Sequence, residues 1–294
     1  MANPLVIVTG KNGQLGWELN RLSNAIAESY DFVFVDVDTL DLSKPKSIPA
    51  FFLQFKPAYF IHCAAYTAVD KAETEQELVY KINSESVGEL AKECAKINCP
   101  FITISTDYVF DGKGTSPYKT DLKPNPLNYY GYTKWIGEKL ALENWKKTII
   151  IRTAWVYSSH AHNFVKTILR LMKDKSEIKV VNDQVGSPTY AADLAQAILQ
   201  IVQQLQAGNE HYGIYHFTNS GVISWYDFAV GIKKLSGLNC KVLPVPSTEY
   251  PTPARRPAYS VMDTQKIVDD FGVELKDWYS SLQICMEMLL LSTD

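Results

Sequence analysis

One short segment, NYYGYTKWIGEK at residues 128–139, holds three tyrosines and then a lysine on a stretch that reads as the start of a helix. Residues four apart share a helix face, and Tyr130 alone of the three phenols has a cation, Lys134, one turn further on. A phenol has a pKa of about 10, so a neighbouring cation is needed to bring it toward neutral pH, where acid–base catalysis works best. The same letters also describe an aromatic helix start that packs on the core beside a solvated lysine.

A glycine-rich loop precedes this segment by more than a hundred residues. Gly10, Gly13 and Gly16 form a G-x-x-G-x-x-G pattern between the apolar run LVIVTG and a helix-like stretch. Glycines at these positions permit a tight turn and let a pyrophosphate approach backbone N–H groups, while the N-terminus of the helix favours an anion. The loop therefore predicts a dinucleotide site.

Acidic residues follow at the distance that such a site requires. Asp36 and Asp38 end the apolar run FVFVDVD, about twenty residues after the loop, where a carboxylate can accept hydrogen bonds from an adenosine ribose. Asp36 would repel the 2′-phosphate of NADPH, whereas Lys11 inside the loop could attract it. Both NADH and NADPH therefore stay open as cofactors.

The elements that carry these residues alternate between apolar β-rich runs and helix-like stretches. Buried strands that alternate with crossover helices are typical of a doubly wound parallel sheet, so the fold class is α/β of the Rossmann type. The strand-like segments are residues 5–10, 32–38, 58–65, 100–106 and 148–157, and the clearest helices span 76–97 and about 129–144.

Beyond residue 157 the pattern loosens and becomes mixed. We expect residues 1–157 to form the dinucleotide-binding domain, with about 190–217 returning to it. Residues 158–189 and 218–294 are expected to form a smaller mixed α/β substrate-binding lobe.

Composition narrows the function classes. A net charge of −3 and a pI near 6.0 provide no basic field for a nucleic-acid backbone, which favours a small-molecule substrate. No segment has the 18 or so apolar residues that a membrane span needs. The five cysteines form no CxxC pair, which fits reduced thiols in a cytoplasmic protein. His160 and His162 have no nearby cluster of other ligands, so no catalytic metal is expected.

The glycine loop and the YxxxK motif together resemble the extended short-chain dehydrogenase/reductase family, whose members bind NAD(P) and mostly act on nucleotide sugars. Within that family the resemblance is closest to reductases of a dTDP-linked 4-keto sugar, and it runs through nearly the whole chain. The matching stretches are GKNGQLGWEL (10–19), AAYTAVDKAE (64–73), STDYVFDG (105–112), YGYTKWIGE (130–138), RTAWVY (152–157), NFVKT (163–167), NDQVGSPTYAADLA (182–195) and PTPARRPAYSVMD (251–263).

The resemblance implies a catalytic set of Thr106, Tyr130 and Lys134. Tyr130 would donate a proton to a carbonyl as hydride arrives, and Lys134 would hold the nicotinamide ribose and lower the pKa of Tyr130. It places Gly13, Gln14 and Leu15 at the pyrophosphate, Asp36, Asp41 and Leu42 near the adenosine, and Ala64, Ala65 and Thr67 along the cofactor. Asp107 and Trp155 are implied sugar contacts, and Tyr108, Asn163, Gln184 and Arg256 are further candidates for the substrate.

The resemblance leaves assembly and several rival functions open. Some relatives bind magnesium at a subunit interface, and a homodimer is one possible assembly. A nucleotide-sugar epimerase or 4,6-dehydratase would share the fold, but dehydratases carry Asp-Glu after the threonine, and here Asp107 and Tyr108 follow Thr106. The non-catalytic regulatory subunit of methionine adenosyltransferase also keeps both motifs, although RTAWVY and NDQVGSPTY fit the reductases better.

Overall fold

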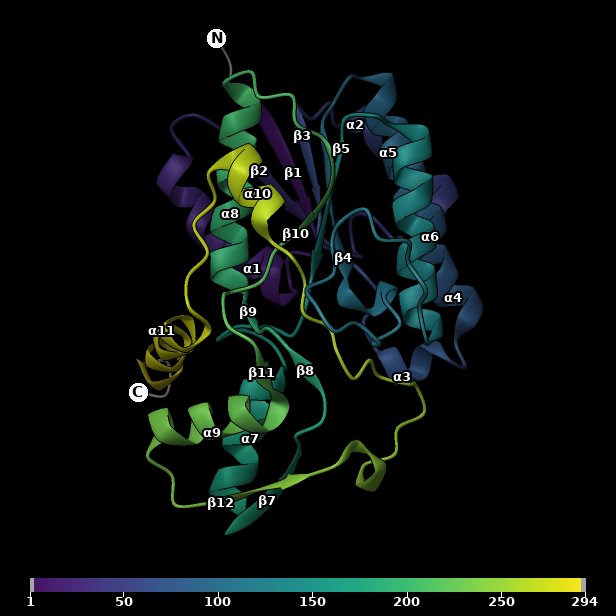
Figure 1. Cartoon of the computed structure of the whole chain (residues 1–294). Coiled ribbons are helices and arrows are strands. Elements are labelled where there is room, and N and C mark those ends of the chain that lie inside the picture. The colour runs from purple at the N-terminus through teal and green to yellow at the C-terminus, as the bar shows by residue number, and fades with distance from the viewer. Residues whose placement is uncertain (1–2, 292–294) are drawn as a thin grey trace.

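The structure is a computed structural model that describes residues 3–291. A six-stranded parallel sheet forms the centre of the molecule (Figure 1). Its spatial order is β10, β5, β4, β3, β1 and β2. The apolar runs of β1, β3, β4 and β5 are largely buried because helices cover both faces of the sheet, whereas the edge strand β2 is only partly buried. The predicted doubly wound sheet is confirmed. The strands are β1 Leu5–Thr9, β2 Asp31–Val35, β3 Tyr59–His62, β4 Phe101–Thr106, β5 Thr148–Thr153 and β10 Gly213–His216.

The order of the strands reverses beside β1. Strand β2 pairs with one edge of β1 and β3 with the other, both in parallel. In an open α/β sheet a ligand binds at the carboxyl ends of the strands on either side of such a reversal. Gly10 follows β1 there and Cys63 follows β3.

Helices cover the two faces of the sheet in separate layers (Figure 1). Side chains of the first layer pack into one hydrophobic cluster with β1, β3 and β5, and those of the second layer pack into another. The first layer is α1 Gln14–Ser23, α8 Ala191–Gln206 and α10 Gln265–Phe271, and the second is α2 Ile48–Gln54, α5 Ser86–Lys96 and α6 Tyr129–Asn144.

A smaller lobe lies beyond the carboxyl ends of the strands (Figure 1). Its helices enclose a third hydrophobic cluster, which includes Tyr157, Phe228 and Leu282. Within residues 3–291, no helix combines the length and the apolar character that crossing a membrane requires. The elements of the lobe are α7 Phe164–Asp174, α9 Trp225–Ser236, α11 Trp278–Leu291, the parallel pair β7 Glu177–Val181 and β12 Lys241–Val245, and the antiparallel pair β8 Val185–Gly186 and β11 Ile223–Ser224.

Two predicted elements are interrupted in the structure. The run at 148–157 splits into β5 and β6 Val156–Tyr157, because Trp155 has a φ of 50° that no strand accommodates, and β6 then pairs with β9 Thr189–Tyr190. The helix predicted at 76–97 consists of α4 Gln76–Tyr80, a π-helical turn Lys81–Glu85 and α5. The short helix α3 Val69–Ala72 precedes it.

The predicted boundary between domain and lobe needs one correction. Helix α8 packs on α1, and β10 joins the sheet beside β5, as expected for residues 190–217. Residues 218–294, however, do not lie wholly in the lobe. The apolar side chains Ile267 and Phe271 of α10 pack into the sheet cluster, because this amphipathic turn fits against α8 and β10.

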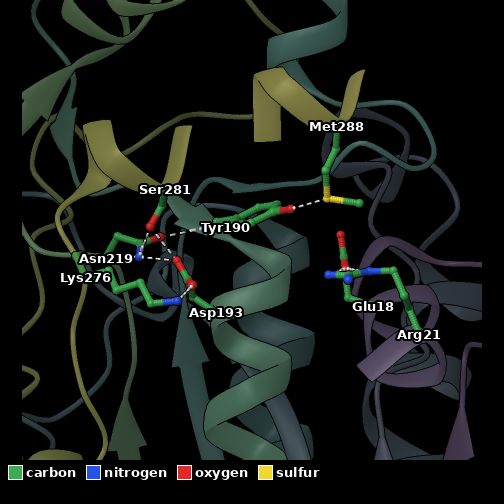
Figure 2. A network of polar contacts seen from close by, with 8 residues as sticks. All are labelled: Glu18, Arg21, Tyr190, Asp193, Asn219, Lys276, Ser281 and Met288. Atoms are coloured by element: carbon green, nitrogen blue, oxygen red, sulfur yellow. Dashed lines mark hydrogen bonds and ion pairs between the residues drawn. The ribbon is translucent and has the colours of Figure 1, made fainter. Parts of the chain in front are cut away.

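A buried polar network joins the lobe to the sheet domain (Figure 2). Asp193 in the first turn of α8 is only 7% exposed and accepts hydrogen bonds from Asn219 at 2.8 Å and from Lys276 Nζ at 2.9 Å. Ser281 of α11 also donates to this carboxylate. Asp193 therefore anchors α11 and the segment after β10 to the same helix end.

Candidate active site

A cavity of about 930 Å³ lies where the carboxyl ends of β1, β3, β4 and β5 face the lobe. The sheet domain contributes the glycine loop and the start of α6 to its walls, and the lobe contributes Phe164 and Trp225. The predicted residues that line this cavity are Gly10, Gly13, Gln14, Leu15, Gly16, Asp36, Ala64, Ala65, Thr67, Thr106, Asp107, Tyr108, Tyr130, Lys134, Trp155 and Arg256.

The glycine loop is built in a way that only glycine allows. Gly10 has a φ of +76°, and a Cβ added at Gly16 would lie 2.1 Å from the carbonyl oxygen of Gly10. The amide of Gly13 donates to that same oxygen at 3.0 Å. The turn therefore directs the N-terminal end of α1 at the cavity, where backbone N–H groups can bind a pyrophosphate.

Asp36 stands at the adenosine end of the cavity with a fixed carboxylate. Its Oδ2 accepts the backbone N–H of Asn12 at 3.0 Å, and its Oδ1 accepts that of Val37 at 2.8 Å. Lys11 is not among the lining residues, and its ammonium group lies 3.3 Å from Oδ2 of Asp38.

Two residues predicted near the adenosine lie outside the cavity lining. Asp41 accepts hydrogen bonds from Ser43 and pairs with Lys44 at 2.9 Å, and these partners, Ser43 first, lower its pKa to about 2. Leu42 packs in the hydrophobic cluster beneath α2. A role for either residue in cofactor binding stays a prediction.

The candidate catalytic residues meet at the junction of β4 and α6. Thr106 ends β4, and Tyr130 and Lys134 lie in the first two turns of α6. The side chain of Asn128 caps this helix by accepting the N–H of Gly131 at 2.8 Å. A Cβ at Gly131 would lie 2.1 Å from the carbonyl oxygen of Tyr108, so glycine lets α6 approach the end of β4 closely.

Burial is the largest cause of the pKa shifts of the candidate catalytic residues Tyr130 and Lys134. It raises the pKa of Tyr130 well above its usual range, and a hydrogen bond with Thr106 only partly opposes this. Burial likewise lowers the pKa of Lys134 to about 8, and its Nζ donates to the carbonyl of Ile104 at 2.7 Å. The net shift of the Tyr130 pKa is therefore upward, and an opposing contribution from Lys134 stays a prediction. A high pKa keeps the phenol protonated, as a proton donor must be.

Asp107 is a buried carboxyl group beside Thr106, the candidate catalytic threonine. Oδ1 accepts the hydroxyl proton of Thr106 at 3.0 Å, while Oδ2 has no hydrogen-bond partner among residues 3–291. Burial raises the pKa of Asp107 to about 6. Asp107 also lines the cavity, and a contact between its carboxyl group and a sugar stays a prediction.

An aromatic wall closes the lobe side of the cavity. The ring of Trp155 stacks on Trp225, with 3.6 Å between ring centroids and an interplanar angle of 13°. A Cβ at Gly186 would lie 2.9 Å from the Trp155 ring, so that glycine makes room for it. The positive φ of Trp155 is backbone strain of the kind that gathers at functional sites.

Arg256 lines the cavity as half of a bidentate ion pair. Its two guanidinium nitrogens donate to the carboxylate of Asp70 at 3.1 and 2.9 Å. The pair fixes the guanidinium plane while leaving 25% of the Arg256 side chain exposed.

Asn163 and Gln184 are not brought to the cavity. Asn163 caps α7 by accepting the N–H of Lys166, and its amide group donates to the carbonyl of Ser158. Gln184 lies just before β8, outside the lining residues.

Sequence analysis missed several residues of this site, of which Asn12 and Trp225 line the cavity and Asp70 pairs with Arg256. Asn12 lies inside the glycine motif, so the motif itself could have indicated it. Asp70 and Trp225 carry no local signal, because each acts through a partner far away in the chain, Arg256 and Trp155 respectively.

The described part of the chain, residues 3–291, contains no group of three or more His, Cys, Asp or Glu residues that could hold a metal ion. The magnesium ion that the resemblance left open is therefore not supported. His160 instead stacks on Trp17, and His162 is hydrogen-bonded to Thr167 at 3.2 Å.

Comparison with known proteins gives matches over nearly the whole chain. Residues 4–291 match the family described as the RmlD substrate binding domain. The chain is 39% identical over 279 residues to the spore coat polysaccharide biosynthesis protein SpsK of Bacillus subtilis, covering 95% of each. It is 37% identical over 297 residues to the dTDP-4-dehydrorhamnose reductase of Burkholderia thailandensis, covering 97% of this chain and 99% of that protein.

Solved structures of reductases with the same name also match nearly the whole chain. A dTDP-4-dehydrorhamnose reductase from Clostridium acetobutylicum superposes with a TM-score of 0.92 at 39% identity, over 97% of this chain and 99% of that one. The dTDP-4-dehydrorhamnose reductase of Bacillus anthracis, solved in complex with NADP, has a TM-score of 0.89 at 36% identity, over 99% of this chain and all of that one.

Proposed function

The chain belongs to the RmlD substrate binding domain family, and from that premise we propose that it is an NAD(P)H-dependent dTDP-4-dehydrorhamnose reductase. The reaction is reduction of the 4-keto group of dTDP-4-dehydro-L-rhamnose, which gives dTDP-L-rhamnose. The relatives named as this reductase cover nearly the full length of the chain, so the proposal concerns the whole protein and not one domain.

The observation that carries this proposal is that one cavity contains both halves of a reductase site. The glycine loop and Asp36 lie at one end, and the aromatic wall of Trp155 and Trp225 lies at the other, with Tyr130 and Thr106 also in the lining. A dinucleotide and a nucleotide sugar can thus meet in the same space beside a proton donor.

The lining residues fit a nicotinamide cofactor, since the glycine loop makes room for a pyrophosphate and Asp36 suits a ribose. A bound nicotinamide would supply the hydride. Tyr130, kept protonated by burial, donates its phenolic proton to the ketone oxygen, so that the product is an alcohol and Tyr130 is left as a phenolate. The Thr106 hydroxyl is hydrogen-bonded to the phenol and helps to orient it. A proton from solvent then converts the Tyr130 phenolate back to the phenol.

Lys134 supports this step from the same helix. Below a pH of about 8 it carries a positive charge, which stabilises the phenolate that forms on Tyr130. Its bond to the Ile104 carbonyl holds the ammonium group at the end of β4.

The site does not fit one of the rival functions, that of a dehydratase. A dehydratase needs a second carboxylate after Asp107, and position 108 is a tyrosine that packs edge-on against Tyr130, with 5.8 Å between ring centroids. The regulatory subunit keeps both motifs, so turnover of the sugar is the observation that separates it from the reductase.

The test is turnover of the proposed substrate. Purified protein should oxidise NADH or NADPH only when dTDP-4-dehydro-L-rhamnose is supplied, and proton NMR should identify dTDP-L-rhamnose as the product. Tyr130→Phe protein serves as the matched inactive control. Absence of turnover with both cofactors, in protein that still binds them, would reject the reductase and favour a binding role.

We also propose that the protein works in the cytoplasm. The five cysteines are free thiols, which fits a reducing cytoplasm. We expect no nucleic-acid partner, and light scattering of the purified protein would decide between a monomer and a homodimer.

A further inference from the structure

A surface ion pair stands beside the adenosine end of the cavity. Lys11 is the only Lys or Arg in the loop GKNGQLG, and its Nζ lies 3.3 Å from Oδ2 of Asp38. The Lys11 side chain is 34% exposed and that of Asp38 is 66% exposed. The loop cation is therefore held at a carboxylate that points to solvent and does not line the cavity.

Asp36 gives this pair its significance. Its carboxylate lines the cavity, and two backbone N–H groups fix it where a ribose is expected. A phosphate on the 2′-oxygen of that ribose would meet the negative charge of Asp36 directly, and Lys11 is the one cation of the glycine loop that could compensate for it.

We propose that Asp38 is a positioning residue that sets the cofactor preference of this chain by holding Lys11 away from the 2′-phosphate. While the Lys11–Asp38 pair is formed, the site favours the cofactor without that phosphate, NADH. NADPH binds when its phosphate draws Lys11 from Asp38. The inference rests on the nicotinamide-cofactor part of the proposed function.

The exposure of the pair limits the size of the effect. Ion pairs between exposed side chains are weak and are screened by salt, so the phosphate can compete for Lys11 and both cofactors should bind. We expect a preference of about two- to tenfold, not exclusion.

The test measures binding of two fragments that differ only in the 2′-phosphate, 5′-AMP and 2′,5′-ADP, by calorimetry at low salt. Asp38→Asn should tighten 2′,5′-ADP about two- to tenfold and leave 5′-AMP within a factor of two. In a Lys11→Met background, Asp38→Asn should change the affinity for 2′,5′-ADP much less than it does in the wild type. Only the repulsion between Asp38 and the phosphate is then removed. Glu77→Gln, which breaks the exposed Lys81–Glu77 pair outside the cavity, is the matched control and should change neither affinity.

Three results would overturn the proposal. They are an unchanged 2′,5′-ADP affinity in Asp38→Asn, an equal gain for both fragments, and a gain that persists in full without Lys11. The last would mean that Asp38 acts by its own repulsion. Because fragment binding needs no sugar, a protein that bound the fragments as expected but failed to reduce the sugar would refute only the reductase.

Discussion

Glu138 of α6 and Arg152 of β5 form a buried bidentate ion pair behind the active site. Nε of Arg152 donates to Oε1 at 2.8 Å and Nη2 donates to Oε2 at 2.7 Å, and neither side chain is more than 4% exposed. Glu138 lies one helical turn after Lys134. The pair therefore ties α6 to strand β5 of the sheet.

Removal of one partner should be far more damaging than removal of both. Glu138→Ala leaves the Arg152 guanidinium buried and unpaired, and should lower the free energy of unfolding by about 3–5 kcal/mol in urea titrations followed by circular dichroism. The double variant Glu138→Leu with Arg152→Met leaves no buried charge and should recover most of that loss. A single variant within 1 kcal/mol of the wild type would contradict this account of the pair.

The buried carboxyl group of Asp107 should lower the free energy of unfolding at neutral pH. Its folded-state pKa of about 6 lies above the ordinary 3.8, so the unfolded state gives up the proton first and stability falls as pH rises through this interval. Asp107→Asn removes that cost. Relative to wild type, the variant should gain on the order of 1 kcal/mol more at pH about 7.5 than at pH about 5.

Asp111→Asn is the control for this pH dependence. Hydrogen bonds, the Lys113 backbone N–H first, hold the pKa of Asp111 below its usual range, so Asp111 is ionised at both pH values in either state. Its effect on stability should be the same at the two pH values. A gain for Asp107→Asn that does not depend on pH would show that its carboxylate is paired by a group not yet identified.

Trp155 should act on the sugar and not on the cofactor. Trp155→Ala removes the ring that faces the cavity and stacks on Trp225, and should raise the KM for the nucleotide sugar or lower kcat while NADPH affinity stays near wild type. Trp225→Ala should produce the same pattern through loss of the stacking partner. A parallel collapse of cofactor binding would mean that the two rings are core packing.

Local spacing explains what could be predicted from the sequence. The three loop glycines are a backbone requirement that any strand–turn–helix of this shape imposes, so seven consecutive letters suffice to indicate them. Tyr130 and Lys134 are one helical turn apart, and the helix at 129–144 is confirmed. The sheet follows from alternating apolar runs.

Other features could not be predicted from the sequence, because they depend on packing between residues far apart in the chain. Trp155 leaves the strand with a positive φ and stacks on Trp225, 70 residues later, and nothing in RTAWVY indicates either feature. Burial is the largest cause of the pKa shifts of Tyr130 and Lys134, and burial depends on the whole fold. Lys11 could be seen as a cation in the loop, but not as one held by Asp38.

The pH profile of the reaction should report Lys134. Burial lowers its pKa to about 8, so the ammonium group is charged below that pH and loses its proton above it. Because the cation stabilises the phenolate, kcat/KM should fall as pH rises through about 8 in the free enzyme. Lys134→Arg, whose guanidinium stays protonated, should be less active but should keep its activity to higher pH. A fall at the same pH in both proteins would assign the ionisation to another group.

Tyr130 should account for the chemistry of the three neighbouring phenols. Tyr130→Phe keeps the buried ring and deletes only the hydroxyl, so folding and cofactor binding should change little while kcat falls by about 10²- to 10⁴-fold, the usual contribution of a general acid. Tyr129→Phe and Tyr132→Phe are matched controls, because neither residue lines the cavity. Each should retain most of the wild-type turnover. Near-full turnover in Tyr130→Phe, or an equal loss in Tyr129→Phe, would show that this face of α6 does not carry the proton.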